Sequence, residues 1–107
     1  PYVRKVIDII KERYMEKLNL ESLSEELMVS SSYLSRKIKE ETGHTFLDLL
    51  HMYRVVQAIR LLRAGTYRVY QISDMTGFSD YKHFCAVFKR YTNSSPTEFA
   101  RPGDHAR

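Results

Sequence analysis

The sequence is poor in the residues that interrupt or crosslink a chain. Among its 107 residues are four glycines, three prolines, one cysteine and no tryptophan. So few glycines and prolines argue against the frequent tight turns of a hairpin protein, and no alternating strand pattern appears. The single cysteine, Cys85, excludes an intrachain disulfide and is typical of a protein in a reducing compartment. We therefore expect a helical protein of the cytoplasm.

Long hydrophobic runs and catalytic groupings are missing as well. No segment approaches the roughly 18 consecutive apolar residues of a transmembrane helix, and no signal-peptide pattern opens the chain. The four histidines are scattered, without cysteines or carboxylates at metal-ligand spacing, and no glycine-rich phosphate loop is present. We therefore expect no enzyme, no metal site and no cofactor.

Composition and charge favour a folded, basic domain. Hydrophobic residues make up 43% and charged residues 28% of the chain, a balance typical of globular proteins. Seventeen Lys and Arg against thirteen Asp and Glu give a net charge of +4, which makes nucleic-acid binding worth testing. Because the chain begins at Pro1 without an initiator methionine, we expect a further domain upstream.

The first half of the chain shows helical periodicity with recognisable ends. Apolar spacing predicts an amphipathic helix over about residues 2–17 and a short helix over 20–27. Ser30 stands where an N-cap is expected before a third helix, and Gly43 where a left-handed residue is expected to end it.

A longer helix is predicted over about residues 46–64, capped by Thr45 and ended by Gly65. Its polar residues recur every three positions: Asp48, His51, Arg54, Gln57, Arg60 and Arg63. A three-residue step advances about 300° on an α-helix, so the polar line winds around the axis. The apolar face must rotate with it, which predicts a connecting helix that packs one end against each of two lobes.

The pattern then restarts. A short helix is predicted over about 69–75, and Ser79 or Asp80 is expected to cap a further helix that ends at Asn93. Pro96 is expected to begin a last short helix.

These two halves form an internal repeat. Leu20–Ser24 corresponds to Val69–Ser73 at an offset of 49 residues. Beyond the next turn the offset becomes 50, which requires one inserted residue in the second turn. The matched pairs there are Leu34 and Phe84, Ile38 and Phe88, Lys39 and Lys89, and Gly43 and Asn93. Glycine and asparagine are the residues that best tolerate positive φ at a helix end.

Each repeat combines a short helix, a turn of about three or four residues and a second helix, which is the helix-turn-helix plan. A plain helical bundle is the simpler alternative, and the repeat favours the first interpretation. The predicted fold is all-α, with about seven helices. Its expected parts are a first helix-turn-helix lobe (1–44), a connecting helix (45–65), a second lobe (66–100) and a flexible tail (101–107).

The repeat resembles the DNA-binding domain of AraC/XylS-type transcription regulators across almost the whole chain. The similar segments are Leu20–Ser24, Ser30–Arg36, Lys39–Gly43, Ile72–Asp80, Phe88–Tyr91 and Ser95–Phe99. The family usually has Ala at Ser73, Phe at Ile38, Gly at Asn93, and Arg at Ala86 and Ala100. The departure at Ala86 matters most, because the arginine at that place in the family faces DNA.

Helical geometry separates an inner from an outer face on each predicted recognition helix. We expect base contacts from Ser32, Ser35, Arg36, Tyr81, Lys82 and Cys85. We expect phosphate contacts from Ser30, Ser31, Lys39, Ser79, Lys89 and Arg90. Arg36 is the foremost base-reading candidate, because a guanidinium can bridge both acceptors of a guanine.

The expected function is sequence-specific binding of double-stranded DNA, with two recognition helices entering successive segments of the major groove. The alternative is a helical interaction module that docks RNA polymerase or another protein without reading DNA. The resemblance implies a cytoplasmic bacterial transcription regulator. Activators of the family recruit RNA polymerase while bound to DNA, so RNA polymerase is an expected partner, and the sequence leaves activator and repressor both open.

Overall fold

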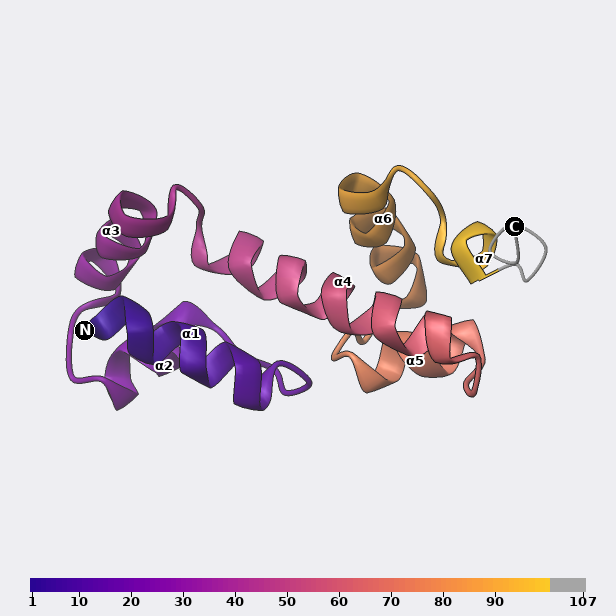
Figure 1. The fold of residues 1–107 in the computed structure, drawn as a ribbon. Coiled ribbons are helices and arrows are strands. Elements are labelled where there is room, and N and C mark those ends of the chain that lie inside the picture. The colour runs from indigo at the N-terminus through magenta and orange to yellow at the C-terminus, as the bar shows by residue number, and fades with distance from the viewer. Residues whose placement is uncertain (101–107) are drawn as a thin grey trace. The chain divides into compact units, whose positions relative to one another are not determined.

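The computed structural model describes residues 1–100, and in that part of the chain it contains seven α-helices and no strand (Figure 1). The helices are α1 (Tyr2–Arg13), α2 (Leu20–Glu26), α3 (Ser31–Thr42), α4 (Phe46–Ala64), α5 (Val69–Met75), α6 (Tyr81–Thr92) and α7 (Pro96–Ala100). The predicted all-α fold is confirmed. The predicted flexible tail, 101–107, lies outside the described residues. No helix within residues 1–100 is both long enough and apolar enough to cross a bilayer.

The chain divides into two units, Pro1–Tyr53 and the residues from Arg54 onward, each with its own hydrophobic core. The first core is formed by α1, α2, α3 and the beginning of α4. Its buried residues are Val3, Val6, Ile10, Leu23, Leu34, Ile38, Phe46 and Leu50. The inner positions predicted for the third helix, Leu34 and Ile38, are therefore confirmed.

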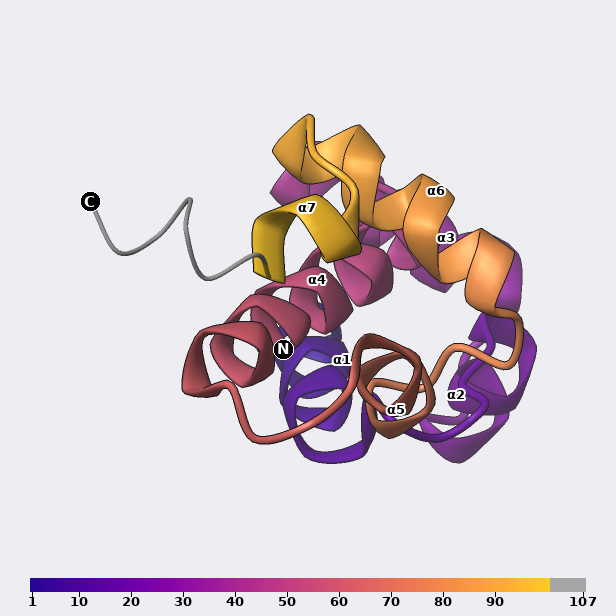
Figure 2. The same ribbon diagram turned by 90° about the vertical axis from the view of Figure 1, so that its right-hand side faces the viewer.

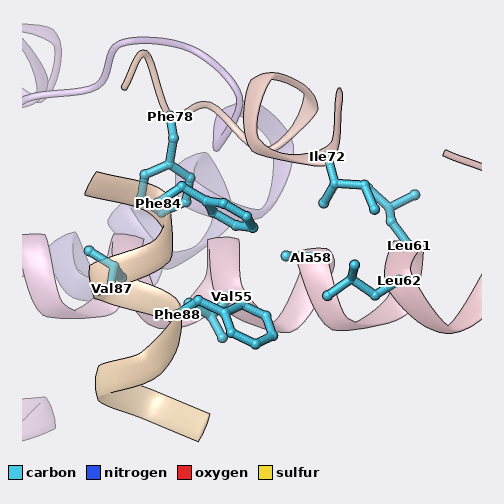
Figure 3. Packing of buried hydrophobic residues seen from close by; sticks show 9 residues of the cluster. All are labelled: Val55, Ala58, Leu61, Leu62, Ile72, Phe78, Phe84, Val87 and Phe88. Carbon is cyan, nitrogen blue, oxygen red and sulfur yellow. The ribbon is translucent and has the colours of Figure 1, made fainter. Parts of the chain in front are cut away.

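The second core is formed by the end of α4 with α5, α6 and α7 (Figure 2). Its buried residues are Val55, Ala58, Leu61, Leu62, Ile72, Phe78, Phe84, Val87 and Phe88 (Figure 3). The Phe84 ring lies 5.2 Å from that of Phe78 and 5.8 Å from that of Phe88, centroid to centroid. Phe99 of α7 adds an edge-on contact to Phe88 at 5.6 Å. Aromatic packing thus joins the α5–α6 turn to α7.

The connecting helix α4 serves both cores. Phe46 and Leu50 lie in the first core, and Ala58 and Leu61 in the second, which confirms the predicted rotation of its apolar face. Part of the row of polar residues on α4 is buried, because His51 and Arg54 lie in the interior.

Arg54 packs against an aromatic ring of its own unit. Its guanidinium carbon lies 5.4 Å from the centre of the Phe78 ring. Burial lowers the pKa of this guanidinium, and the ring face offsets part of the lost hydration through a cation–π contact.

Most predicted helix ends are confirmed by their hydrogen bonds. The Ser30 hydroxyl accepts from the Tyr33 amide at 3.1 Å, and Gly43 takes a φ of 77° at the end of α3. At the start of α4 the Thr45 hydroxyl accepts from the Asp48 amide at 3.0 Å, while the Asp48 carboxylate accepts from the Thr45 amide at 3.2 Å. These two bonds form a capping box.

One predicted helix end is wrong. Helix α1 ends at Arg13 and does not continue to residue 17. The chain leaves the helix there because Leu18 and Leu20 must reach the first core.

The cap of α6 is Asp80, whose carboxylate accepts from the Lys82 amide at 3.1 Å, and Ser79 caps nothing. Ser79 lies one residue too early in the chain to reach the first amides of the helix.

Candidate nucleic-acid interface

The two helix-turn-helix units repeat in their backbone hydrogen bonds. Val29 N donates to Ser24 O at 3.0 Å in the first turn, and Phe78 N donates to Ser73 O at 3.1 Å in the second. These pairs still stand 49 residues apart, whereas the caps Ser30 and Asp80 stand 50 apart. The inserted residue predicted from the sequence is therefore Ser79.

The turns themselves differ in length by that one residue. Residues 27–30 separate α2 from α3, and residues 76–80 separate α5 from α6. The first turn thus has four residues, within the predicted three or four, and the second has five because of the predicted insertion.

The far ends of α3 and α6 also repeat. The Thr42 hydroxyl donates to Ile38 O at 2.7 Å, and the Thr92 hydroxyl donates to Phe88 O at 2.9 Å. Asn93 takes a φ of 63° where the first unit has Gly43, as the sequence predicted. The threonine pair was missed at the sequence level, although its 50-residue spacing was available as a signal. Both recognition helices consequently end in the same geometry.

Most of the residues predicted to contact DNA in the first unit lie together. A surface hollow of about 670 Å³ between α2 and α3 is lined by Leu20, Glu21, Ser31, Ser32, Ser35, Arg36, Lys39 and Glu40. Five of the six predicted contact residues of this unit are among them, and the sixth, Ser30, is the cap of α3. This hollow, which we call the α2–α3 groove, is the candidate base-reading surface of the first unit.

Arg36 lines this groove, is exposed, and contacts an aromatic ring of its own helix. Its guanidinium carbon lies 5.5 Å from the centre of the half-buried Tyr33 ring. The neighbouring Lys37 ammonium lies 5.8 Å from the same ring and 3.6 Å from a carboxylate oxygen of Glu40. Contact with a ring limits the orientations of the guanidinium and so lowers the entropy lost on binding.

Two carboxylates, Glu21 and Glu40, line the same groove and were missed at the sequence level. Glu40 follows Arg36 by one helical turn, so helical spacing was a usable signal for it. Glu21 belongs to α2, and only the packing of α2 against α3 brings it to the groove.

The equivalent face of α6 carries a different set of side chains. The equivalent pairs, 50 residues apart, are Ser32 and Lys82, Ser35 and Cys85, Arg36 and Ala86, and Lys39 and Lys89. Lys82, Ala86, Lys89 and Arg90 are exposed, whereas Cys85 is half-buried. Helix α6 has three Lys or Arg and no acidic residue, while α3 has three and two. The second recognition helix is therefore the more positive.

Tyr81, a predicted base-reading residue, is held partly inside the second unit. Its ring lies 6.2 Å from that of Phe84. Burial raises the pKa of the Tyr81 phenol, and a hydrogen bond with Thr97 of α7 partly opposes this rise. Cys85 also raises the pKa of this phenol. With 41% of its surface exposed, Tyr81 presents only part of its ring for a DNA contact.

The starts of the two recognition helices differ in charge. A neutral hydroxyl, that of Ser30, caps α3, whereas the carboxylate of Asp80 caps α6. A helix N-terminus attracts phosphate through its amides and dipole, and a carboxylate already in place weakens that attraction. In residues 1–100 no cluster of three or more His, Cys, Asp or Glu side chains is arranged to hold a metal ion.

Two helix-turn-helix units in tandem, each with an outward recognition helix, define the class of a double helix-turn-helix DNA-binding domain. A family profile described as "Helix-turn-helix domain" matches residues 23–102, and the chain belongs to this family.

Its relatives are transcription regulators. The chain is 38% identical over 100 residues to the transcriptional regulatory protein HptR of Staphylococcus aureus, a match that covers 94% of this chain and 39% of that protein. The chain thus spans about two fifths of the curated relatives that it matches.

Solved structures show the same fold. The C-terminal domain of AraT, a response regulator from Geobacillus stearothermophilus, is 34% identical with a TM-score of 0.90, and the match covers 94% of this chain and 84% of that one. The DNA-binding domain of AdpA, a global transcriptional factor, was solved in complex with a target DNA. It is 28% identical with a TM-score of 0.86, and the match covers 92% of this chain and 88% of that one. The resemblance to AraC-type domains is confirmed, and with it a function in sequence-specific DNA binding for transcription regulation.

Proposed function

We propose that this domain binds double-stranded DNA with both recognition helices, each inserting its outer face into a segment of the major groove. The observation that carries this proposal is the shared register of α3 and α6. Equivalent caps, equivalent helix ends and equivalent buried residues leave the same positions of each helix facing outward. The similar DNA-binding domain of AdpA, which was solved in complex with a target DNA, supports DNA binding by a domain of this fold.

Each recognition helix contacts both base edges and phosphates in this proposal. In the first unit Arg36 reads a guanine while Lys39 and Ser31 contact the backbone. In the second unit Lys82 is the leading base-reading residue, because the position equivalent to Arg36 is Ala86. Lys89 and Arg90 neutralise phosphates near the end of α6. Tyr81, Cys85, Ser32 and Ser35 add short-range contacts.

The length of the connecting helix is compatible with contacts in two successive groove segments. Helix α4 has 19 residues, which corresponds to roughly 28 Å at 1.5 Å per residue. This length is comparable with the ~34 Å of one turn of DNA, so two successive groove segments are within reach, on straight or on bent DNA. In this proposal the chain consists of a first lobe (1–44), a connector (45–65) and a second lobe (66–100).

The proposal extends to the protein that contains this domain. We infer a sensor or dimerisation domain upstream, in line with the 39% coverage of HptR and with the description of AraT as a response regulator. We also infer recruitment of RNA polymerase, as in AraC-type activators, with the cytoplasm as the place of action and no catalytic activity in this domain.

Selection from a randomised DNA library with the 107-residue chain tests the proposal. The expected result is a site with two specified blocks about one helical turn apart, bound with an affinity that falls steeply as salt rises. A site with a single block contradicts insertion of both helices. Absence of salt-dependent DNA binding, together with retained binding to RNA polymerase, supports the helical docking module instead.

A further inference from the structure

We propose that Glu21 is a further base-reading residue of the first unit, accepting a hydrogen bond from the exocyclic amino group of a cytosine in the major groove. This inference rests on the proposed function, because it assigns a role to one wall of the surface proposed to face the bases. It adds a carboxylate of α2 to a set of proposed base-reading residues that otherwise belong to the recognition helix α3.

The position of Glu21 carries the proposal. It lines the α2–α3 groove together with Arg36, Ser32 and Ser35, all of which project from α3. Glu21 itself belongs to the first turn of α2, which begins after the Asn19 cap. A base pair that Arg36 contacts in the proposed complex therefore faces a surface that also carries the carboxylate of Glu21.

The carboxylate is also available for a partner. Glu21 is exposed, and among residues 1–100 no Lys, Arg or His nitrogen lies within ion-pair distance of it. Glu40, the other carboxylate of the groove, is engaged with Lys37 at 3.6 Å. Arg36 is not neutralised by Glu21 in the free domain, so both can act on DNA.

The charge of the Glu21 carboxylate determines which kind of DNA atom it can bind. An ionised carboxylate only accepts hydrogen bonds, and phosphate oxygens are acceptors too, so the two repel each other. Exocyclic amino groups are the donors that DNA offers in the major groove, and Glu pairs typically with the N4 amino group of cytosine. In the major groove of DNA, a G·C pair presents the acceptors of guanine to Arg36 and the N4 amino group of cytosine to Glu21.

The second unit provides an internal contrast. The residue equivalent to Glu21, 49 positions later, is Tyr70, which is 54% exposed and carries no carboxylate. The proposed cytosine contact therefore applies to the first half-site only.

Library selection with the wild-type chain, Glu21→Gln and Glu25→Gln tests the assignment. Glu25 is the matched control, because it is an exposed carboxylate on the same helix that does not line the groove. We expect Glu21→Gln to lose about ten-fold of the preference for cytosine at one position of the first half-site. Glu25→Gln should keep the wild-type preference at every position.

The competing outcome is a change in affinity without a change in preference. If Glu21→Gln binds all sequences more tightly and selects the wild-type consensus, Glu21 merely repels phosphates and the assignment is overturned. Because preference is a ratio of affinities measured on one protein sample, partial unfolding of a variant does not alter it. Failure of the wild-type chain to select any sequence overturns the proposed function itself, which separates the two hypotheses.

Discussion

Arg36 and Ala86 occupy equivalent positions on the two recognition helices, 50 residues apart, and both are exposed. The first unit thus offers a guanidinium where the second offers a methyl group. Conversely, the first-turn position holds Ser32 in the first unit and Lys82 in the second. A long cationic side chain thus stands in the second turn of α3 (Arg36) but in the first turn of α6 (Lys82). Under the proposed function, we expect the two helices to read different parts of their half-sites.

Arg36→Ala should relax the base preference of the first half-site and cost about 1 to 3 kcal/mol of binding free energy. The loss follows from removal of a bidentate contact to guanine. Fluorescence anisotropy on matched and mismatched duplexes measures it, with Lys37→Ala as control because Lys37 is engaged with Glu40. An unchanged preference removes Arg36 from the base-reading set.

Ala86→Arg should add a preference for guanine in the second half-site, since it restores the guanidinium at the position equivalent to Arg36. The same measurement on duplexes that vary in that half-site checks it. Ala86→Met is the control, because it adds length without charge. Equal tightening on all sequences would show that the new arginine reaches only phosphate.

Lys89→Ala should weaken binding to all sequences alike. It should also reduce the slope of log affinity against log salt by about one, since one phosphate contact is lost. Titrations at several salt concentrations measure the slope, with Lys11→Ala on α1 as control. A loss that depends on the sequence of the duplex contradicts a phosphate role.

Met28→Gly should stabilise the first unit by about 1 kcal/mol. Met28 takes a φ of 60° and its side chain is 89% exposed, whereas the equivalent residue of the second turn is Gly77. The left-handed conformation costs an L-residue roughly 1 to 2 kcal/mol, and the larger unfolded-state entropy of glycine offsets part of the gain.

Urea denaturation measures the effect of this change. Met15 is exposed too but lies outside the left-handed region, so Met15→Gly should destabilise instead. Loss of stability in Met28→Gly would show that the methionine makes contacts that outweigh the strain.

Acid should weaken the start of α4. Hydrogen bonds from the Thr45 amide and side chain hold the pKa of Asp48 below its ordinary value of 3.8. A depressed folded-state pKa gives stability that is fully present above the ordinary value and is lost as the pH falls through the folded-state value.

Thermal unfolding between about pH 5 and pH 2, a range that brackets ordinary Asp pKa values, should therefore be less pH-dependent in Asp48→Asn than in the wild type. Asp8→Asn on α1 serves as the control, because Asp8 caps no helix. Equal acid sensitivity of Asp48→Asn and the wild type contradicts the role of this capping box.

The division of α3 into a buried and an outward face was predictable because it depends on local pattern. Apolar spacing places Leu34 and Ile38 inside, and the same spacing leaves Ser32, Ser35, Arg36 and Lys39 outside. The choice between two possible caps was left open by the sequence. Ser79 and Asp80 both have side chains suited to capping, and only the path of the longer turn selects Asp80.

By itself, the sequence determined seven helices, two repeated units and a connecting helix whose apolar face rotates, because helical periodicity and capping act over a few residues. Tertiary structure alone decided which side chains from different helices share a surface. Glu21 joins Arg36 in the α2–α3 groove because α2 packs on α3, and Arg54 lies over Phe78 because the α5–α6 turn packs on α4. Such contacts come from burial of apolar faces between segments distant in the chain, which no local pattern records.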